Sequence, residues 1–138
     1  MHNYAAALFA QGLAETAYLV KLLGGQTETV YSLPGAGDLY VTTQGGRNSR
    51  MGRLLGLGMS YSDAVEEMPG ETIEGVDAAI AIMPAIEQMM ASGKIAADAL
   101  PLLRAMYHIV TRNSEVTFDF NSFFSHLPFN PPLDAASH

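Results

Sequence analysis

Apolar residues recur at helical spacing along most of the chain. In residues 3–23 the side chains of Phe9, Leu13, Ala17 and Val20 share one face, which predicts an amphipathic helix. Periodicity and end signals predict further helices over 27–31, 47–56, 76–92 and 98–112. One weak apolar run late in the chain is the sole competing strand signal, so we expect an all-α fold.

Glycine and proline mark the helix ends. We expect helices to end at three glycine sites: Gly24-Gly25, Gly56-Leu57-Gly58 and Gly93. Pro69-Gly70 predicts a turn, and residues 71–75 after it are expected to be extended or irregular. Pro84 lies inside the 76–92 pattern and predicts a kink or a split into two helices, because proline removes a backbone hydrogen bond.

The same patterns predict one cap and the inward faces. Ser60 or Ser62 is expected to cap a short helix that has Asp63 in its first turn, and Arg50 and Arg53 are expected to face outward. The inward residues of the helices over 47–56 and 98–112 are expected to be Met51, Leu54, Leu55, Leu102, Leu103, Met106, Ile109 and Val110. One side of the 76–92 helix is expected to be covered by Val76, Ala79, Ile80, Met83, Ile86, Met89 and Met90. A short aromatic helix is expected around Phe118, Phe120, Phe123 and Phe124. We thus expect one domain of about six to seven helices over 1–125 and an irregular tail over 126–138.

Composition narrows the class of protein. A chain of 138 residues with 49% hydrophobic and 15% charged residues is typical of a globular domain. The absence of cysteine excludes disulfides and thiolate metal ligands, and it agrees with a cytoplasmic setting. No run approaches 18 apolar residues, so we expect no membrane span. No metal site is expected, because the histidines lack ligand spacing: His2, His108, His126 and His138.

Candidate chemistry is concentrated in residues 33–48. Asp38 and Thr42 are four residues apart, which on a helix would place a carboxylate beside a hydroxyl on one face. Gly45-Gly46 breaks any such helix, and a new helix starting at Arg47-Asn48 would present its unpaired N–H groups and the guanidinium of Arg47 together. This arrangement predicts an anion site.

The charge distribution supports the same prediction. The net charge is −7, yet Arg47, Arg50 and Arg53 lie within one short window, with no acidic residue between Asp38 and Asp63. A local positive group on an acidic protein argues against nucleic acid and favours a small anion such as a phosphate ester. A solvated helix face whose arginines pair with acids elsewhere in the fold would give the same pattern, and charge alone does not distinguish the two.

These residues resemble a known enzyme family. Gly37-Asp38-Leu39 followed by Thr42-Thr43, Gly45-Gly46 and Arg47-Asn48 resembles the substrate-domain signature of NAD(P)-dependent glycerol-3-phosphate dehydrogenases. Three weaker segments in the right order extend the resemblance over roughly residues 3 to 112: Asn3 to Glu15, Thr72-Ile73-Glu74-Gly75, and Pro101-Leu102 with Tyr107. The resemblance implies the all-α C-terminal domain of the 6-phosphogluconate-dehydrogenase-like dehydrogenases.

The resemblance also implies roles at the substrate. Arg47 and Asn48 would bind the phosphate of glycerol 3-phosphate or dihydroxyacetone phosphate, and Thr42 would donate its hydroxyl to the substrate. Asp38 would be the catalytic residue of this chain, orienting a lysine beside the substrate hydroxyl. Two simpler readings stay open: Asp38 as a helix cap, and Thr42 bonded back to its own helix.

The cofactor implied by the resemblance is NAD or NADP, used for hydride transfer between the two phosphate esters. Arg47 would also lie near the dinucleotide, and Thr72 and Glu74 would stand close to it. Glu74 as an ordinary surface acid is the alternative.

The chain also departs from the family. The dinucleotide-binding Rossmann domain and the catalytic lysine that precede this region are not in the sequence, Gln11 and Ala5 replace a common arginine and lysine, and the stretch from Glu74 to Pro101 is longer than usual. The chain thus resembles the C-terminal half of the enzyme, and we expect it to show almost no turnover alone with NADH and dihydroxyacetone phosphate. A Rossmann subunit and a second copy of the chain are candidate partners. A stand-alone phosphometabolite-binding or subunit-docking module, and a purely structural domain, are the alternatives.

Overall fold

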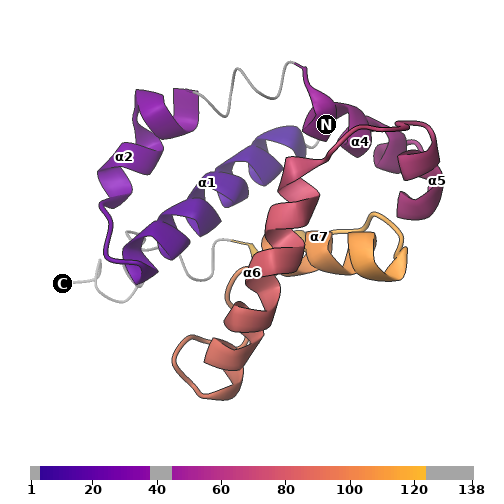
Figure 1. The fold of residues 1–138 in the computed structure, drawn as a ribbon. Coiled ribbons are helices and arrows are strands. Elements are labelled where there is room, and N and C mark those ends of the chain that lie inside the picture. Colours follow the sequence, from indigo (N-terminus) through magenta and orange to yellow (C-terminus); the bar gives the residue numbers. More distant parts are fainter. Residues whose placement is uncertain (1–3, 38–44, 124–138) are drawn as a thin grey trace. The chain divides into compact units, whose positions relative to one another are not determined.

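The computed structural model describes residues 4–37 and 45–123, and every regular element among them is helical (Figure 1). The prediction of an all-α fold is therefore confirmed for the described part of the chain. Its α-helices are α1 (Tyr4–Leu22), α2 (Thr27–Tyr31), α4 (Arg47–Gly56), α5 (Tyr61–Glu66), α6 (Glu74–Ala91) and α7 (Pro101–Arg112). A π-helical turn, η1, spans Leu33–Gly37, and a 3-10 turn, η2, spans Phe120–Ser122.

The chain divides into two compact units. The first is Met1–Asp38 with Asp119–His138, and the second is Leu39–Phe118. In the first unit α2 and η1 pack together and α2 packs on α1, whereas in the second α7 packs on α6 and α4 on α5. The boundary between a domain over 1–125 and a tail over 126–138 stays a prediction, because residues 124–138 lie outside the described ranges.

Three helices end in the same way, at glycines where the sequence pattern predicts an end. After α1, α4 and α6 the chain turns through a glycine of positive φ: Gly24, Gly58 and Gly93. In each case the amide after the glycine bonds back into the last turn, as Lys94 does to the Met89 carbonyl at 2.9 Å. The amide of the glycine itself also donates to a carbonyl of that turn. These two hydrogen bonds form the Schellman motif, which satisfies carbonyl groups that the helix leaves unpaired.

The α1 helix matches the predicted span to within one residue at each end, but its buried face differs. Ala14 and Ala17 are buried as an apolar face requires, whereas Phe9, Leu13 and Val20 are only half-buried. Gln11 and Glu15 are buried as well, and Gln11 Nε2 donates to Glu15 Oε2 at 2.8 Å. The hydrogen bond lets two polar side chains one helical turn apart share a buried position.

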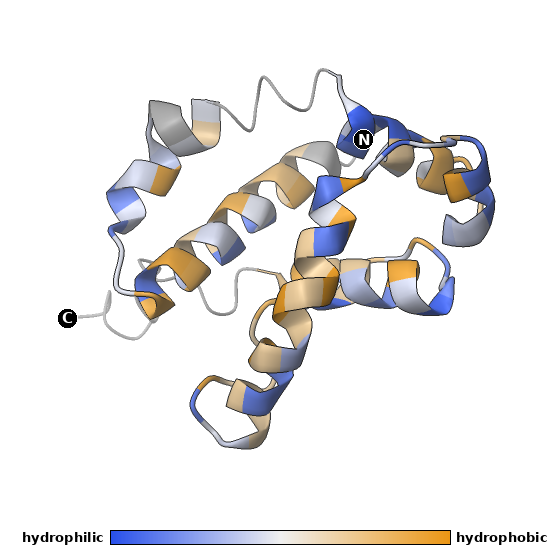
Figure 2. Cartoon of the chain, in the orientation of Figure 1, coloured by the Kyte–Doolittle hydropathy of each residue, from blue (hydrophilic) through white to orange (hydrophobic). Residues whose placement is uncertain are grey.

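A compact core holds the second unit together. Its buried members come from three helices and the segment before α6: Met51, Ala64, Met68, Ile73 and Val76. Leu54 and Leu55 pack against it and Arg50 and Arg53 are exposed, so the predicted faces of α4 are confirmed. Ser60, not Ser62, caps α5, since its hydroxyl accepts from the Asp63 amide at 3.2 Å. In Figure 2 the middle of α6 is apolar around much of its surface, whereas the start of α4 is hydrophilic.

The α6 helix corrects one prediction and rules out one of the two alternatives given for Pro84. It begins at Glu74, so the expected extended segment ends at Ile73, and the amides of Val76 and Asp77 both bond to the Ile73 carbonyl. It also runs through Pro84 without splitting. Pro84 and Ile80, whose carbonyl loses its usual donor, are both exposed, so water can satisfy that carbonyl and the helix continues.

The α7 helix begins later than predicted. Its first residue is Pro101, and Leu100 before it adopts a left-handed conformation with φ 58°. Proline disfavours the right-handed helical conformation in the residue that precedes it, so a helix over 98–100 cannot run into α7. Ile109 is buried as predicted, but Met106, which is also expected to face inward, is 42% exposed. The predicted aromatic helix is the turn η2, next to which Phe123 is buried; Phe124 lies outside the described residues.

Met83 offers a direct test of the packing around α6. Its side chain is among the largest fully buried ones, so Met83→Ala should lower the free energy of unfolding by about 2–5 kcal/mol. Urea unfolding followed by circular dichroism measures this change. Met106→Ala removes the same atoms from a half-exposed position and should cost much less. Equal losses in the two variants would contradict the assigned packing of α6.

Candidate functional site

The candidate anion site lies at the start of α4. Gly46 precedes the helix with a φ of 102°, a conformation that glycine adopts without strain, and provides no side chain to cap it. Arg47 and Asn48 are the first two residues of the helix, as predicted. The first turn of any α-helix presents backbone N–H groups that have no acceptor within the helix, and it is the positive end of the helix dipole.

The start of α6 is held against the start of α4 by two side-chain contacts. Arg47 Nη2 lies 3.3 Å from Glu74 Oε1, and the backbone N–H of Gly75 donates to Asn48 Oδ1 at 3.1 Å. The partners in each contact are 27 residues apart in sequence. We call these four residues, Arg47, Asn48, Glu74 and Gly75, the α4–α6 clamp. It unites the predicted phosphate-binding pair with one predicted cofactor-binding residue.

Asn48 caps α6 from outside that helix. Ile73, the residue before α6, makes no side-chain cap, so the Asn48 oxygen satisfies one of the amides of the first turn instead. Because a backbone N–H can only donate, the atom that faces it is Oδ1, and the Asn48 side chain keeps its Nδ2 group as a donor for a ligand. Asn48 thus combines a structural role with the predicted binding role.

Gly75 allows this close approach. A Cβ atom built on Gly75 would lie 3.0 Å from Asn48 Oδ1 and 3.4 Å from its Cγ, closer than ordinary van der Waals contact. The residue pattern does not predict that this position needs a glycine, although Gly75 belongs to the Thr72-Ile73-Glu74-Gly75 segment that carries part of the resemblance. Its role depends on a neighbour from another helix, which local sequence does not reveal.

Two arginines of the charged window, Arg47 and Arg50, pair with acids elsewhere in the fold, as the alternative interpretation of that window predicts. Besides the Arg47 pair, Arg50 Nη1 lies 3.1 Å from Glu71 Oε1, and Arg50 Nη2 donates to the Glu67 carbonyl at 3.1 Å. The Arg47 and Glu74 side chains are 51% and 76% exposed, and such surface pairs contribute roughly 0–1 kcal/mol. A weak pair leaves Arg47 open to a competing anion, so the ion pair and the anion site are compatible.

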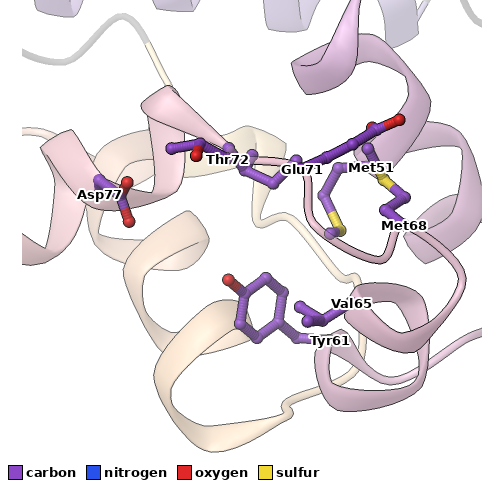
Figure 3. Close-up of a pocket in the computed structure, with 8 residues that line it drawn as sticks. Met51, Tyr61, Val65, Met68, Glu71, Thr72 and Asp77 are labelled. Carbon is purple, nitrogen blue, oxygen red and sulfur yellow. The ribbon is translucent and has the colours of Figure 1, made fainter.

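Thr72, predicted to lie near the cofactor, lines a pocket of about 270 Å³ in the second unit (Figure 3). The pocket has an apolar part, which includes Met51 and Met68, and two carboxylates, Glu71 and Asp77. Burial and the neighbouring Asp77 carboxylate raise the pKa of Tyr61, which also lines the pocket, above its usual 10.

The described residues suit only one edge of a dinucleotide. Among the described residues no cation lines the pocket at Thr72, and with Glu71 paired to Arg50 it is the Asp77 carboxylate that would repel a diphosphate. Arg47, Thr72 and Glu74 are all exposed, and they offer a guanidinium for phosphate and oxygen atoms for ribose hydroxyls. They could contact a dinucleotide that is held mainly by another domain.

The structure does not describe two of the predicted site residues. Asp38 and Thr42 lie outside the described residues, so their roles stay predictions. Within the described ranges no group of three or more His, Cys, Asp or Glu side chains could hold a metal ion. In the same ranges no helix has the length and apolar character needed to cross a membrane.

Comparisons with known proteins match the chain to one family. The family model described as NAD-dependent glycerol-3-phosphate dehydrogenase C-terminus matches residues 1–118. The NADP(+)-dependent glycerol-3-phosphate dehydrogenase of Archaeoglobus fulgidus is 35% identical over 126 residues, which cover 89% of this chain and 36% of that protein. The NAD(P)+ glycerol-3-phosphate dehydrogenase of Clostridium tetani is 33% identical over 118 residues, covering 84% and 32%.

A third glycerol-3-phosphate dehydrogenase also matches most of this chain. The NAD(P)+ glycerol-3-phosphate dehydrogenase of Koribacter versatilis is 40% identical over 114 residues, covering 72% of this chain and 34% of that protein. The chain therefore spans about a third of the length of these relatives. No solved structure matches it.

Substitution of Asn48 tests whether its hydrogen bond to the Gly75 amide stabilises the fold. Asn48→Ala removes the acceptor of the Gly75 amide and should lower the free energy of unfolding by about 1 kcal/mol. Asn48→Asp keeps an acceptor oxygen and places a negative charge at a helix start, so it should stay within about 0.5 kcal/mol of the unchanged chain. Urea unfolding compares the three proteins. If aspartate were as destabilising as alanine, Asn48 would not act as the cap of α6.

Proposed function

Because the chain belongs to the family of C-terminal domains of NAD-dependent glycerol-3-phosphate dehydrogenases, we propose that it binds the phosphate group of the substrate at the start of α4. The substrates are glycerol 3-phosphate and dihydroxyacetone phosphate. Arg47 and the Nδ2 group of Asn48 are the side-chain donors of this site, and the first-turn amides of α4 add to them.

The observation that carries the proposal is the exposed guanidinium of Arg47 at the first position of α4, beside the start of a second helix. A phosphate monoester has up to two negative charges and several acceptor oxygens, which match a guanidinium and helix-terminal N–H groups. The α4 helix itself contains no acidic residue, so nothing within it would repel the ligand.

Asp38 and Thr42 complete the site in this proposal. Thr42 donates its hydroxyl to the substrate, and Asp38 orients the lysine that a cofactor-binding domain outside these 138 residues contributes. The family is NAD(P)-dependent, and the nicotinamide cofactor supplies the hydride when it is bound. Arg47, Thr72 and Glu74 then contact one edge of that cofactor.

The proposal implies partners of stated kinds. The ligand is a phosphate ester, and the cofactor-binding domain belongs to the same polypeptide or to a separate subunit. A second copy of the chain is a further candidate. We place the protein in the cytoplasm, in line with the absence of cysteine.

The proposal is tested by titrating the isotope-labelled chain with glycerol 3-phosphate and following its backbone amide shifts by NMR. Backbone amide shifts at Gly46, Arg47 and Asn48 should saturate with ligand. Arg47→Ala should raise the dissociation constant roughly ten- to a hundred-fold, the range that a hydrogen bond to a charged group is worth.

Arg53→Ala is the matched control. It removes the same charge from an exposed position on α4, nearly two turns further along the helix, and should change the dissociation constant little. Absence of shifts at millimolar ligand, or equal loss in both variants, would contradict a specific phosphate site at Arg47. A stable complex with a Rossmann protein without any such shifts would favour a docking module instead.

A further inference from the structure

The Arg47–Glu74 ion pair places a carboxylate at the position where the proposed function needs a phosphate. Glu74 is in the first turn of α6, and its Oε1 lies 3.3 Å from Arg47 Nη2. A carboxylate at this place interacts favourably with the positive end of the α6 dipole as well as with the guanidinium. In the ligand-free chain the Glu74 carboxylate is therefore bound to the guanidinium that would also attract an anionic ligand.

The backbone of the clamp keeps this carboxylate close. The Gly75 amide is bonded to Asn48 at 3.1 Å, which fixes the start of α6 beside the start of α4. Glu74 is the residue directly before Gly75, so its side chain starts from a fixed point near Arg47. The competition between Glu74 and a ligand is thus intramolecular and acts at a high effective concentration.

The neighbouring pair differs in its acid, because the Arg47 and Arg50 side chains are equally exposed, at 51% and 50%. Arg50 bonds both to Glu71, whose side chain is 34% exposed, and to the Glu67 carbonyl. Two acceptors fix the Arg50 guanidinium in place. The Glu74 side chain is 76% exposed, and in the described part of the chain it is the ion-pair partner of Arg47. The Arg47–Glu74 pair is the easier of the two to open.

We propose that Glu74 is an internal competitor of the phosphate ligand: it neutralises Arg47 in the ligand-free chain, and a phosphate monoester displaces it on binding. This inference rests on the proposed function. Glu74 then sets the affinity of the site, because the measured dissociation constant increases as the fraction of chains with an unpaired Arg47 falls. A ligand must carry enough charge to replace the carboxylate, which favours a phosphate monoester over a neutral polyol.

Glu74→Gln tests the inference with glycerol 3-phosphate as the probe. Glutamine keeps the size of the side chain and removes its charge, so the dissociation constant should fall roughly two- to five-fold, the range that an exposed ion pair is worth. Amide shifts at Gly46, Arg47 and Asn48 provide the measurement. Glu71→Gln is the matched control: it removes the same charge from the Arg50 pair and should leave the dissociation constant nearly unchanged.

The outcomes separate the two proposals. Saturable shifts in the unchanged chain with equal or weaker binding in Glu74→Gln would overturn the competition and leave the phosphate site standing. Equal tightening in Glu74→Gln and Glu71→Gln would also overturn it, since a general change in charge would then explain the effect. Absence of shifts in the unchanged chain and in Glu74→Gln would overturn the phosphate site and the competition together.

Discussion

The hydrogen bond from the Gly75 amide to Asn48 Oδ1 links the starts of α4 and α6, which the core also joins through Met51 and Val76. Glycine suits position 75, because a Cβ there would lie 3.0 Å from Asn48 Oδ1 and would force that side chain to shift. This arrangement places two helix N-termini together beside Arg47. Three sources of positive potential in one place are unfavourable unless an anion neutralises them, and Glu74 provides that anion in the ligand-free chain. The ion pair therefore balances the positive potential that this arrangement brings together.

The parts of the fold that depend on local sequence could be predicted. The bounds of α4 and the helix ends at Gly24, Gly58 and Gly93 follow from periodicity and from the ability of glycine to adopt positive φ. The burial of Met51 follows from the apolar face of α4. These features require no knowledge of distant residues, because each is fixed within one or two helical turns.

The starts of α6 and α7 could not be predicted as well. Neither is preceded by a residue whose side chain caps the helix, so the usual signal is missing. The start of α6 is stabilised by Asn48, 27 residues before Gly75, and spacing along the sequence carries no information about such a partner. The start of α7 does have a local cause, Pro101, but the apolar pattern extends past it and suggests a longer helix.

The candidate site also has a part that local sequence predicts and a part that depends on distant residues. The residue pattern identifies Arg47 and Asn48 as the beginning of a helix with anion-binding character, and the structure places them there. Whether the arginines of this window serve a ligand or the fold depends on acids far away in sequence, which the pattern could not supply. Arg50 is held by two acceptors, as expected of a structural residue.

Arg47 differs from Arg50 in ways that suit a ligand. It has an exposed partner and the first position of the helix, where the dipole is strongest. In the described part of the chain, the pocket beside Thr72 is lined by Asp77 and by Glu71, which pairs with Arg50, and by no cation, so it does not favour a diphosphate. In the proposed function this chain therefore positions one phosphate group, and the larger part of a dinucleotide is bound by another domain.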